Sequence, residues 1–135
     1  FGVLTKPSDQ KNYLGILFSS RAFDNVAPKD SELFTVLVGG ERQKELCSLP
    51  IEQLETIILR ELEQLICHQG EVTFKKHFRW KKGIPQYDMN QEKLSAAIKV
   101  FEAQNPGIYI LGNFYQGISV SDCILKAKNI ANKLV

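Results

Sequence analysis

Residues 108–123 have the types and spacing that could bind an anionic or electron-rich ligand. Four apolar residues are followed by two glycines, Gly112 and Gly117, and then by a stretch with helical spacing. Glycine lets a backbone turn sharply and approach a ligand, because no Cβ stands in the way. The first amides of a helix, at its partly positive end, favour a phosphate or an electron-rich oxygen. The pattern by itself also fits a plain helix start, in which the serine and aspartate side chains of 119–122 serve as caps.

The strands that would support this segment are predicted from apolar runs. Residues 13–18 and 33–38 predict two antiparallel strands, and 1–5 predicts a third. Because the two main runs are nearly continuous, we expect both faces of their sheet to be covered. A further strand is expected over 71–80.

Three helices are expected from apolar residues spaced by three and four. The first begins at Pro50, where no amide hydrogen is needed, the second covers 91–103 and the last 121–134. A short strand is expected at 108–111, so that helix, strand and helix follow one another. The apolar stripe of the first helix is Ile51, Leu54, Ile58, Leu62 and Leu65. The expected buried side of the second helix carries Leu94, Ile98 and Phe101. The order of elements predicts an α+β fold.

Composition and charge argue against nucleic-acid binding and against a membrane span. The 135 residues are 44% apolar and 24% charged, with a net charge of +2. This balance does not indicate a nucleic-acid-binding protein, which relies on clustered positive charge. The basic and aromatic stretch 75–82 is the nearest candidate, and the solvated face of a strand explains it more simply. No apolar run approaches the roughly 20 residues that cross a bilayer.

The cysteines and histidines predict no metal site. Cys47, Cys67 and Cys123, with His68 and His77, have no spacing typical of zinc ligands and lie in no nucleophile motif. Free thiols fit a reducing, cytoplasmic location. Peripheral membrane contact, if any, is expected from regions outside this chain.

Two blocks of sequence carry a family resemblance. Gly112 to Ile124 has the form Gly-Asn-x-Tyr-x-Gly-Ile-Ser-Val-x-Asp-Cys-Ile, and Arg79 to Tyr87 has the form Arg-Trp-x-x-Gly-Ile-Pro-Gln-Tyr. The first block is similar to the carboxy-terminal signature of the oxygen-dependent protoporphyrinogen oxidases, a branch of the flavin amine-oxidase superfamily. The second resembles the crossing from that family's substrate domain to its flavin. The family commonly continues with Gly-His where Asp88 and Met89 stand, so no role of that histidine carries over.

The resemblance implies which residues meet the cofactor, FAD. In the family, backbone around 118–120 would contact the flavin, and amides near Ser121 would stabilise negative charge at its pyrimidine edge. Trp80 would lie against the flavin or wall its cavity, although an ordinary core tryptophan explains it equally well. The expected cofactor-binding residues are Trp80, Gly112, Asn113, Gly117, Ile118, Ser119 and Val120.

The resemblance also implies a division of the chain. Residues 1–80, an antiparallel or mixed sheet with packed helices, would be part of a substrate-binding domain, and 81–135 would return to an FAD-binding Rossmann domain. No GxGxxG turn for a dinucleotide occurs in the sequence, since Gly39-Gly40 lacks a third glycine. We therefore expect that unit upstream of Phe1, and the opening with Phe rather than Met resembles a fragment boundary.

The expected function of the parent protein is oxidation of a porphyrinogen to a porphyrin in haem biosynthesis, with electrons passing through FAD to oxygen. No catalytic residue is assigned, because flavin oxidation does not require a side-chain base, and the isolated chain is expected to be inactive. One alternative is a related flavin amine oxidase, which Asn113 and the Asp122-Cys123 pair disfavour. The other is a small non-enzymatic α+β domain that binds a ligand or partner through 75–82.

Overall fold

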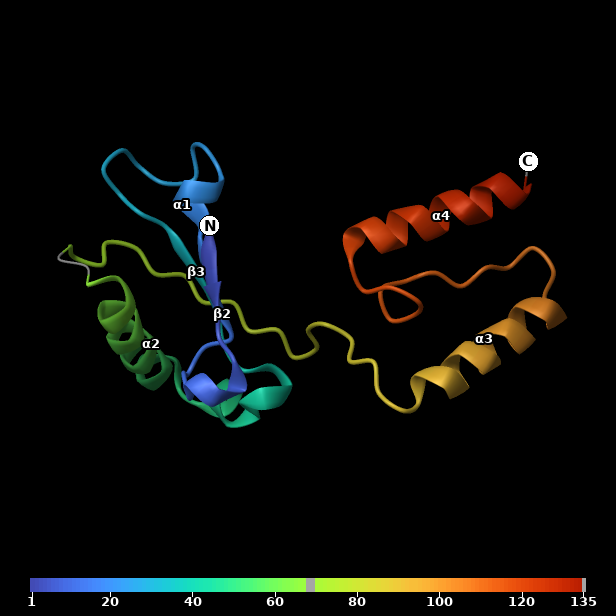
Figure 1. Ribbon diagram of the computed structural model, residues 1–135, viewed down its shortest axis with the longest axis horizontal. Coiled ribbons are helices and arrows are strands. Elements are labelled where there is room, and N and C mark those ends of the chain that lie inside the picture. The colour runs from blue at the N-terminus through green and yellow to red at the C-terminus, as the bar shows by residue number, and fades with distance from the viewer. Residues whose placement is uncertain (68–69, 135) are drawn as a thin grey trace. The chain divides into compact units, whose positions relative to one another are not determined.

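The computed structural model describes residues 1–67 and 70–134, so His68 lies outside the described residues. The chain forms two compact units, Phe1–Arg79 and Trp80–Val135, which are described separately (Figure 1). The first unit holds a sheet and a long helix, and the second holds two long helices. The structure is α+β, as the order of elements predicts. The assignment of 1–80 and 81–135 to a substrate domain and a flavin domain stays a prediction.

The sheet of the first unit has three antiparallel strands in the order β1-β2-β3. They are β1 (Gly2–Leu4), β2 (Gly15–Phe18) and β3 (Phe34–Leu37). The three predicted strands are confirmed, each somewhat shorter than its apolar run. Short helical turns lie between and after them, namely η1 (Pro7–Asp9), α1 (Ser19–Ala22), η2 (Gly40–Arg42) and η3 (Lys44–Ser48).

One face of the sheet carries the core of this unit. Helix α2 (Ile51–Ile66) begins after Pro50, as predicted, and its Leu62 packs with Ile16 and Tyr13. Ile16 is fully buried, whereas Leu17 on the opposite face is 39% exposed. The prediction that both faces are covered is therefore wrong for the described chain. Side chains alternate between the faces of a strand, and α2 covers one of them.

A polar cluster of Glu61, Asn12 and Lys11 links α2 to the segment that connects β1 and β2. Glu61 on α2 is buried, accepts a hydrogen bond from Asn12 Nδ2 (2.9 Å) and lies 3.0 Å from Lys11 Nζ. Burial acts to raise the pKa of the Glu61 carboxyl, but hydrogen bonds from Lys11 and Asn12 outweigh burial and lower that pKa. The cluster thus keeps a buried charge paired, which avoids a large desolvation cost.

The predicted strand over 71–80 is wrong. The structure assigns no strand there, and the described backbone offers this segment no partner strand. Lys75 pairs with Glu55 on α2, and Arg79 Nη2 donates to the carbonyl of Leu49 (2.9 Å). Apolar side chains of the segment, such as Phe74 and Phe78, are about two-thirds exposed, at 67% and 68%. A strand forms only when another strand supplies hydrogen-bond partners, and none does so here.

The second unit contains α3 (Gln91–Gln104), α4 (Val120–Leu134), the segment that leads into α3 and the segment between the helices (Figure 1). Both helices are confirmed. The predicted strand at 108–111 is wrong, because these residues pair with no described strand. The amide of Ile110 instead donates to the side chain of Glu102 on α3 (2.8 Å).

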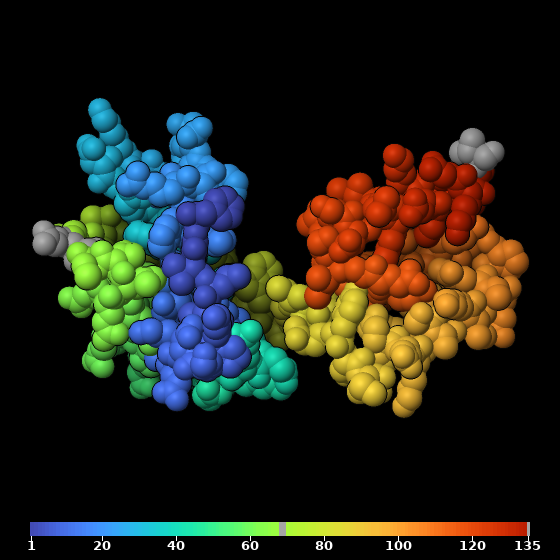
Figure 2. All heavy atoms as spheres, in the orientation of Figure 1, coloured from blue at the N-terminus to red at the C-terminus, as the bar shows by residue number. Residues whose placement is uncertain are grey.

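Little of the second unit is buried. Ile98 is 4% exposed, as the helical spacing predicts, but Leu94 and Phe101 are 37% and 42% exposed, which corrects the expected buried side. The apolar residues of α4 lie largely at the surface, with Ile124 64% and Leu125 57% exposed. The atoms of this helix are the red spheres of the space-filling view (Figure 2). None of the described helices has the length and apolar character that a membrane span requires.

Candidate functional site

Tyr87 closes the loop that precedes α4. Its hydroxyl donates a hydrogen bond to the carbonyl oxygen of Asn113 (3.0 Å) and accepts one from the amide of Gly117 (2.8 Å). One phenol oxygen therefore joins the two ends of the turn at 113–117. This contact brings the two sequence blocks that carry the family resemblance together, across 30 positions of the chain.

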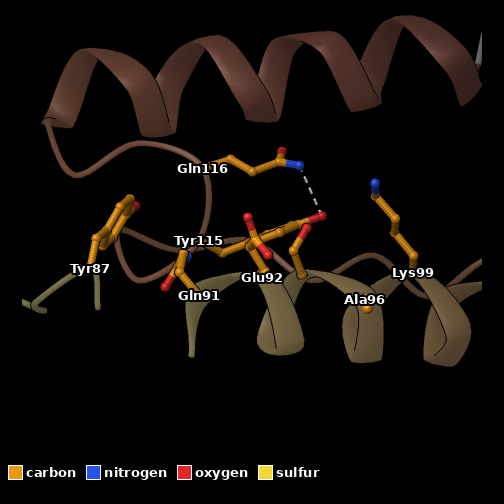
Figure 3. Close-up of a pocket in the computed structure, with 8 residues that line it drawn as sticks. Tyr87, Gln91, Glu92, Ala96, Lys99, Tyr115 and Gln116 are labelled. Carbon is orange, nitrogen blue, oxygen red and sulfur yellow. Dashed lines mark hydrogen bonds between the residues drawn. The ribbon is translucent and has the colours of Figure 1, made fainter. Parts of the chain in front are cut away.

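Three further contacts hold the middle of this loop. Gln91 on α3 donates from Nε2 to the carbonyl of Phe114 (3.0 Å). Tyr115 is 7% exposed, and Lys126 Nζ from α4 lies 5.1 Å from the centre of its ring. Gln116 Nε2 donates to the Tyr115 hydroxyl (3.0 Å), as Figure 3 shows. The buried ring of Tyr115 thus connects the loop with α4.

Side chains of the chain itself pack closely on both glycines of the loop, and the backbone conformation favours glycine at 117. Gly117 has φ +138°, and a Cβ built on it would lie 2.5 Å from the Cβ of Asp122. A Cβ on Gly112 would lie 2.3 Å from the ring of Phe114. The space that each glycine leaves open is therefore filled by a neighbouring side chain of this chain. Any residue with a Cβ at 117 would also be strained at this φ.

Ser119 and Asp122 form a reciprocal cap at the start of α4. Asp122 N donates to Ser119 Oγ (3.0 Å), and Asp122 Oδ2 accepts from both the amide (3.2 Å) and the hydroxyl (2.7 Å) of Ser119. This is the arrangement of a capping box, with Asp in the place of the usual Glu. The hydroxyl and amide of Ser119 hold the pKa of the Asp122 carboxyl below its ordinary value. The capping interpretation of these two residues is confirmed.

The same start of α4 presents amides that the described chain does not use. The amides of Ile118, Val120 and Ser121 donate to no atom of the described residues. A groove of about 450 Å³ lies beside them. Its lining is mainly apolar and comprises Asn113, Ile118, Val120, Cys123, Ile124 and Ala127. Two of its lining residues, Ile118 and Val120, thus carry an unused amide, and most of the lining is apolar.

A second groove, of about 400 Å³, lies between α3 and the loop (Figure 3). Its lining is Tyr87, Gln91, Glu92, Ser95, Ala96, Lys99, Tyr115 and Gln116. Tyr87 and Gln91 use their side chains to hold the loop. This groove is therefore the side of the loop on which the supporting contacts lie.

The structure groups only some of the predicted cofactor-binding residues. Asn113, Ile118 and Val120 line one groove, whereas Ser119 is occupied by the cap. The amide of Gly117 is used by Tyr87, and Gly112 packs on Phe114. Trp80 is 79% exposed and belongs to neither groove. Whether these seven residues bind a cofactor stays a prediction.

Sequence reasoning missed three supporting residues: Tyr87, Gln91 and Tyr115. Tyr87 and Tyr115 lie inside the two sequence blocks that carry the family resemblance, which was the available signal. The hydrogen bonds that Tyr87 and Gln91 make with the loop could not be predicted, because they join residues 26, 30 and 23 positions apart. In the parts of the chain that the structure describes, no group of His, Cys, Asp or Glu side chains could hold a metal ion.

Comparison with known proteins places the chain. Residues 5–135 match the sequence profile of a family described as flavin containing amine oxidoreductase. The chain belongs to this family. Over its full length it is 35% identical to a mitochondrial protoporphyrinogen oxidase of Nicotiana tabacum and 33% identical to protoporphyrinogen oxidase 2, chloroplastic/mitochondrial, of Arabidopsis thaliana. It is also 22% identical, over 82% of its length, to a coproporphyrinogen III oxidase of Bacillus subtilis.

These three relatives of the chain are much longer than the chain itself. It spans 27% of each plant protein and 24% of the bacterial one. The family resemblance carried by the two sequence blocks is confirmed, and the family is one of flavin-containing proteins.

The start of α4 fits one part of a flavin. Its unused amides at 118, 120 and 121 are donors for the oxygens and nitrogens of a flavin edge. Ile118, Val120 and Ile124 supply apolar surface for a planar ring. The diphosphate of FAD requires a glycine-rich turn after a strand, and the sequence contains none. The residues present therefore fit an edge of the ring and not the whole cofactor.

Proposed function

We propose that a polypeptide containing this chain is an FAD-dependent oxidase that converts protoporphyrinogen to protoporphyrin in haem biosynthesis, with oxygen as the final electron acceptor. The observation that carries the proposal is the 35% and 33% identity to two protoporphyrinogen oxidases over the full length of the chain. Identity to a coproporphyrinogen III oxidase is lower, at 22%. We take protoporphyrinogen as the first candidate substrate because both relatives above 30% identity are protoporphyrinogen oxidases, and coproporphyrinogen as the second, since another coproporphyrinogen III oxidase is 26% identical.

We assign to this chain one side of the flavin site. The cofactor, when bound, would accept electrons two at a time and be reoxidised by oxygen between steps, so that three such rounds would supply the six-electron oxidation of porphyrinogen to porphyrin. The amides of Ile118 and Val120, backed by the positive end of α4, would donate to the pyrimidine edge of the ring and stabilise negative charge there. The apolar wall around Ile124 would exclude water from that edge. Asn113 and Gly112 would shape the approach, and Trp80 would meet the cofactor from the preceding segment.

The polar side chains at this site hold the loop and the start of α4 in place, and we assign no proton transfer to them. Asp122 is engaged by Ser119, and the Tyr87 hydroxyl is engaged by two backbone groups. Both groups are thus engaged in holding the loop and the start of α4. We accordingly propose no catalytic acid or base in this chain.

The uncovered apolar surfaces support a place within a larger protein. Leu37 on the open face of the sheet is 48% exposed, and Ile124 on α4 is 64% exposed. Exposed apolar surface of this kind is typical of faces that pack against further structure. We propose that residues 1–80 complete a substrate-binding domain and that 81–135 pack on an FAD-binding domain. A cytoplasmic location stays a prediction.

The decisive experiment is made on the full-length protein that contains this chain. We expect the purified protein to show a flavin absorbance spectrum and to turn colourless protoporphyrinogen into fluorescent protoporphyrin while consuming oxygen. Coproporphyrinogen and a primary amine, supplied in parallel, distinguish the two neighbouring activities. A protein that lacks flavin and cannot take up added FAD would contradict the proposal. A flavoprotein that oxidises only the amine would favour the related amine-oxidase function.

A further inference from the structure

We propose that Tyr87 is a positioning residue for the flavin, which acts by fixing the loop 113–117 and thereby the amides that follow it. This inference rests on the proposed function of the same site. It adds a residue outside the expected cofactor-binding set and assigns its effect to one oxygen atom. Tyr87 touches the loop and not the groove lined by Ile118 and Val120.

The first argument is the geometry of the hydroxyl. It donates to the carbonyl of Asn113 at 3.0 Å and accepts from the amide of Gly117 at 2.8 Å. A tyrosine hydroxyl can make both bonds at once, because it has one hydrogen and two lone pairs. It thereby links the start and the end of a five-residue turn. A phenylalanine ring in the same place would fill the space and make neither bond.

The second argument is that the other contacts leave the end of the loop unheld. Gln91 reaches the carbonyl of Phe114, and Tyr115 is fixed by burial and by Lys126. These contacts act on Phe114 and Tyr115, and Gln116 uses only its side chain, to reach the Tyr115 hydroxyl. Gly117, at φ +138°, is the last residue before the unused amides, and its own amide is directed to Tyr87. The orientation of the peptide that carries the Ile118 amide therefore depends on this bond.

The third argument concerns which amides remain available. Gly117 N is committed to the Tyr87 oxygen, and Ser119 N to Asp122. The amides of Ile118 and Val120 alternate with these and have no partner within the described chain. Two internal bonds thus leave the amides of Ile118 and Val120, together with that of Ser121, for an external acceptor. Without the Tyr87 hydroxyl, the Gly117 amide would compete for that acceptor and this selection of amides would be lost.

The test is Tyr87→Phe in the full-length flavoprotein, with Tyr109→Phe as the matched control. Tyr109 lies in the same unit, is 40% exposed, and its hydroxyl bonds to no described residue. Loss of two neutral hydrogen bonds that order the loop should raise the dissociation constant for flavin about tenfold. The flavin midpoint potential should become more negative, because misplaced amides stabilise the reduced ring less well. Tyr109→Phe should change neither quantity.

Hydrogen exchange of the unaltered protein provides a second measurement that needs no variant. In the flavin-free protein, the Gly117 amide should exchange slowly and the Ile118 amide rapidly, and added flavin should slow the exchange of Ile118. Rapid exchange at Gly117 would show that the bond to Tyr87 is not formed and would overturn the inference. This outcome holds even if Tyr87→Phe does not fold.

The outcomes separate this inference from the proposed function. If the full-length protein binds flavin, and Tyr87→Phe has an unchanged dissociation constant, spectrum and potential, then the positioning role of Tyr87 is wrong and the oxidase function stands. If the full-length protein binds no flavin at all, the proposed function itself fails. If Tyr109→Phe has the same effect as Tyr87→Phe, the change is a general loss of stability, and the inference is again wrong.

Discussion

Different interactions stabilise the interior of each of the two units. The first has an apolar centre, in which Ile16, Tyr13 and Leu62 pack between a sheet and α2. The second buries only Ile98 and Tyr115 among its described apolar side chains, and its loop is held by hydrogen bonds from Tyr87 and Gln91. Burial is non-directional and scales with area, whereas hydrogen bonds fix orientation but add little net stability. The comparison shows that the first unit depends mainly on apolar burial, whereas the described part of the second depends more on hydrogen bonds that orient its loop.

The largest expected effect concerns activity of the chain by itself. We expect residues 1–135 alone to show no measurable oxidation of protoporphyrinogen, because they supply one edge of the flavin site and no diphosphate-binding turn. Added FAD should bind weakly at most. The measurement is porphyrin fluorescence and FAD titration, with the full-length protein as the positive control. Tight FAD binding by the chain alone would show that the second unit does not depend on further structure.

The core of the first unit offers the next largest effect. Ile16→Ala removes a fully buried side chain and should lower the free energy of unfolding by about 2–5 kcal/mol. Leu17→Ala, the neighbouring residue on the open face, should cost less than about 1 kcal/mol in the chain alone. Urea unfolding of the two variants compares them. Equal losses would mean that the second face of the sheet is also covered, and would remove the contrast with the second unit.

Gly117→Ala tests the shape of the loop in the second unit. The added Cβ would lie within 2.5 Å of Asp122 at a strained φ, so the start of α4 must shift. We expect a loss of about 1–3 kcal/mol in the stability of the loop and a lower flavin content of the full-length protein. Gly83→Ala is the control, because nothing lies within 4 Å of a Cβ at that position. Unchanged flavin content and potential in Gly117→Ala would contradict the assignment of this loop to the cofactor.

The smallest expected effect lies in the polar cluster of the first unit. Hydrogen bonds lower the pKa of the buried Glu61 carboxyl, so its contribution to stability is present above the unfolded-state pKa, near 4.5, and is lost as the pH falls through the lower folded-state pKa. Glu61→Gln should cost about 1 kcal/mol at neutral pH and should flatten the acid limb of the stability profile. Unfolding measured from pH 7 to pH 3 tests this. An acid limb identical to that of the unaltered chain would assign the pH dependence to other carboxyls.

The sequence predicted most of the regular elements. Apolar spacing located α2 after Pro50 and also located α3 and α4, because a helix satisfies its backbone hydrogen bonds within its own residues. The strands at 15–18 and 34–37 were found because each run has a partner nearby in the chain. The strands expected at 71–80 and 108–111 failed for the opposite reason. A strand depends on a partner that its own residues do not specify, and neither segment has one within the described chain.

By itself, the sequence determined the helices, the family, and the capping pair of Ser119 and Asp122, since each depends on residues close together in the chain or on a contiguous motif. Only the tertiary structure decided which apolar residues are covered and which loop amides are left free. Those outcomes depend on contacts such as Tyr87 with Gly117, which connect positions 30 residues apart. No local pattern encodes such a contact, because it forms only when the segment that follows α3 brings the chain back to Tyr87.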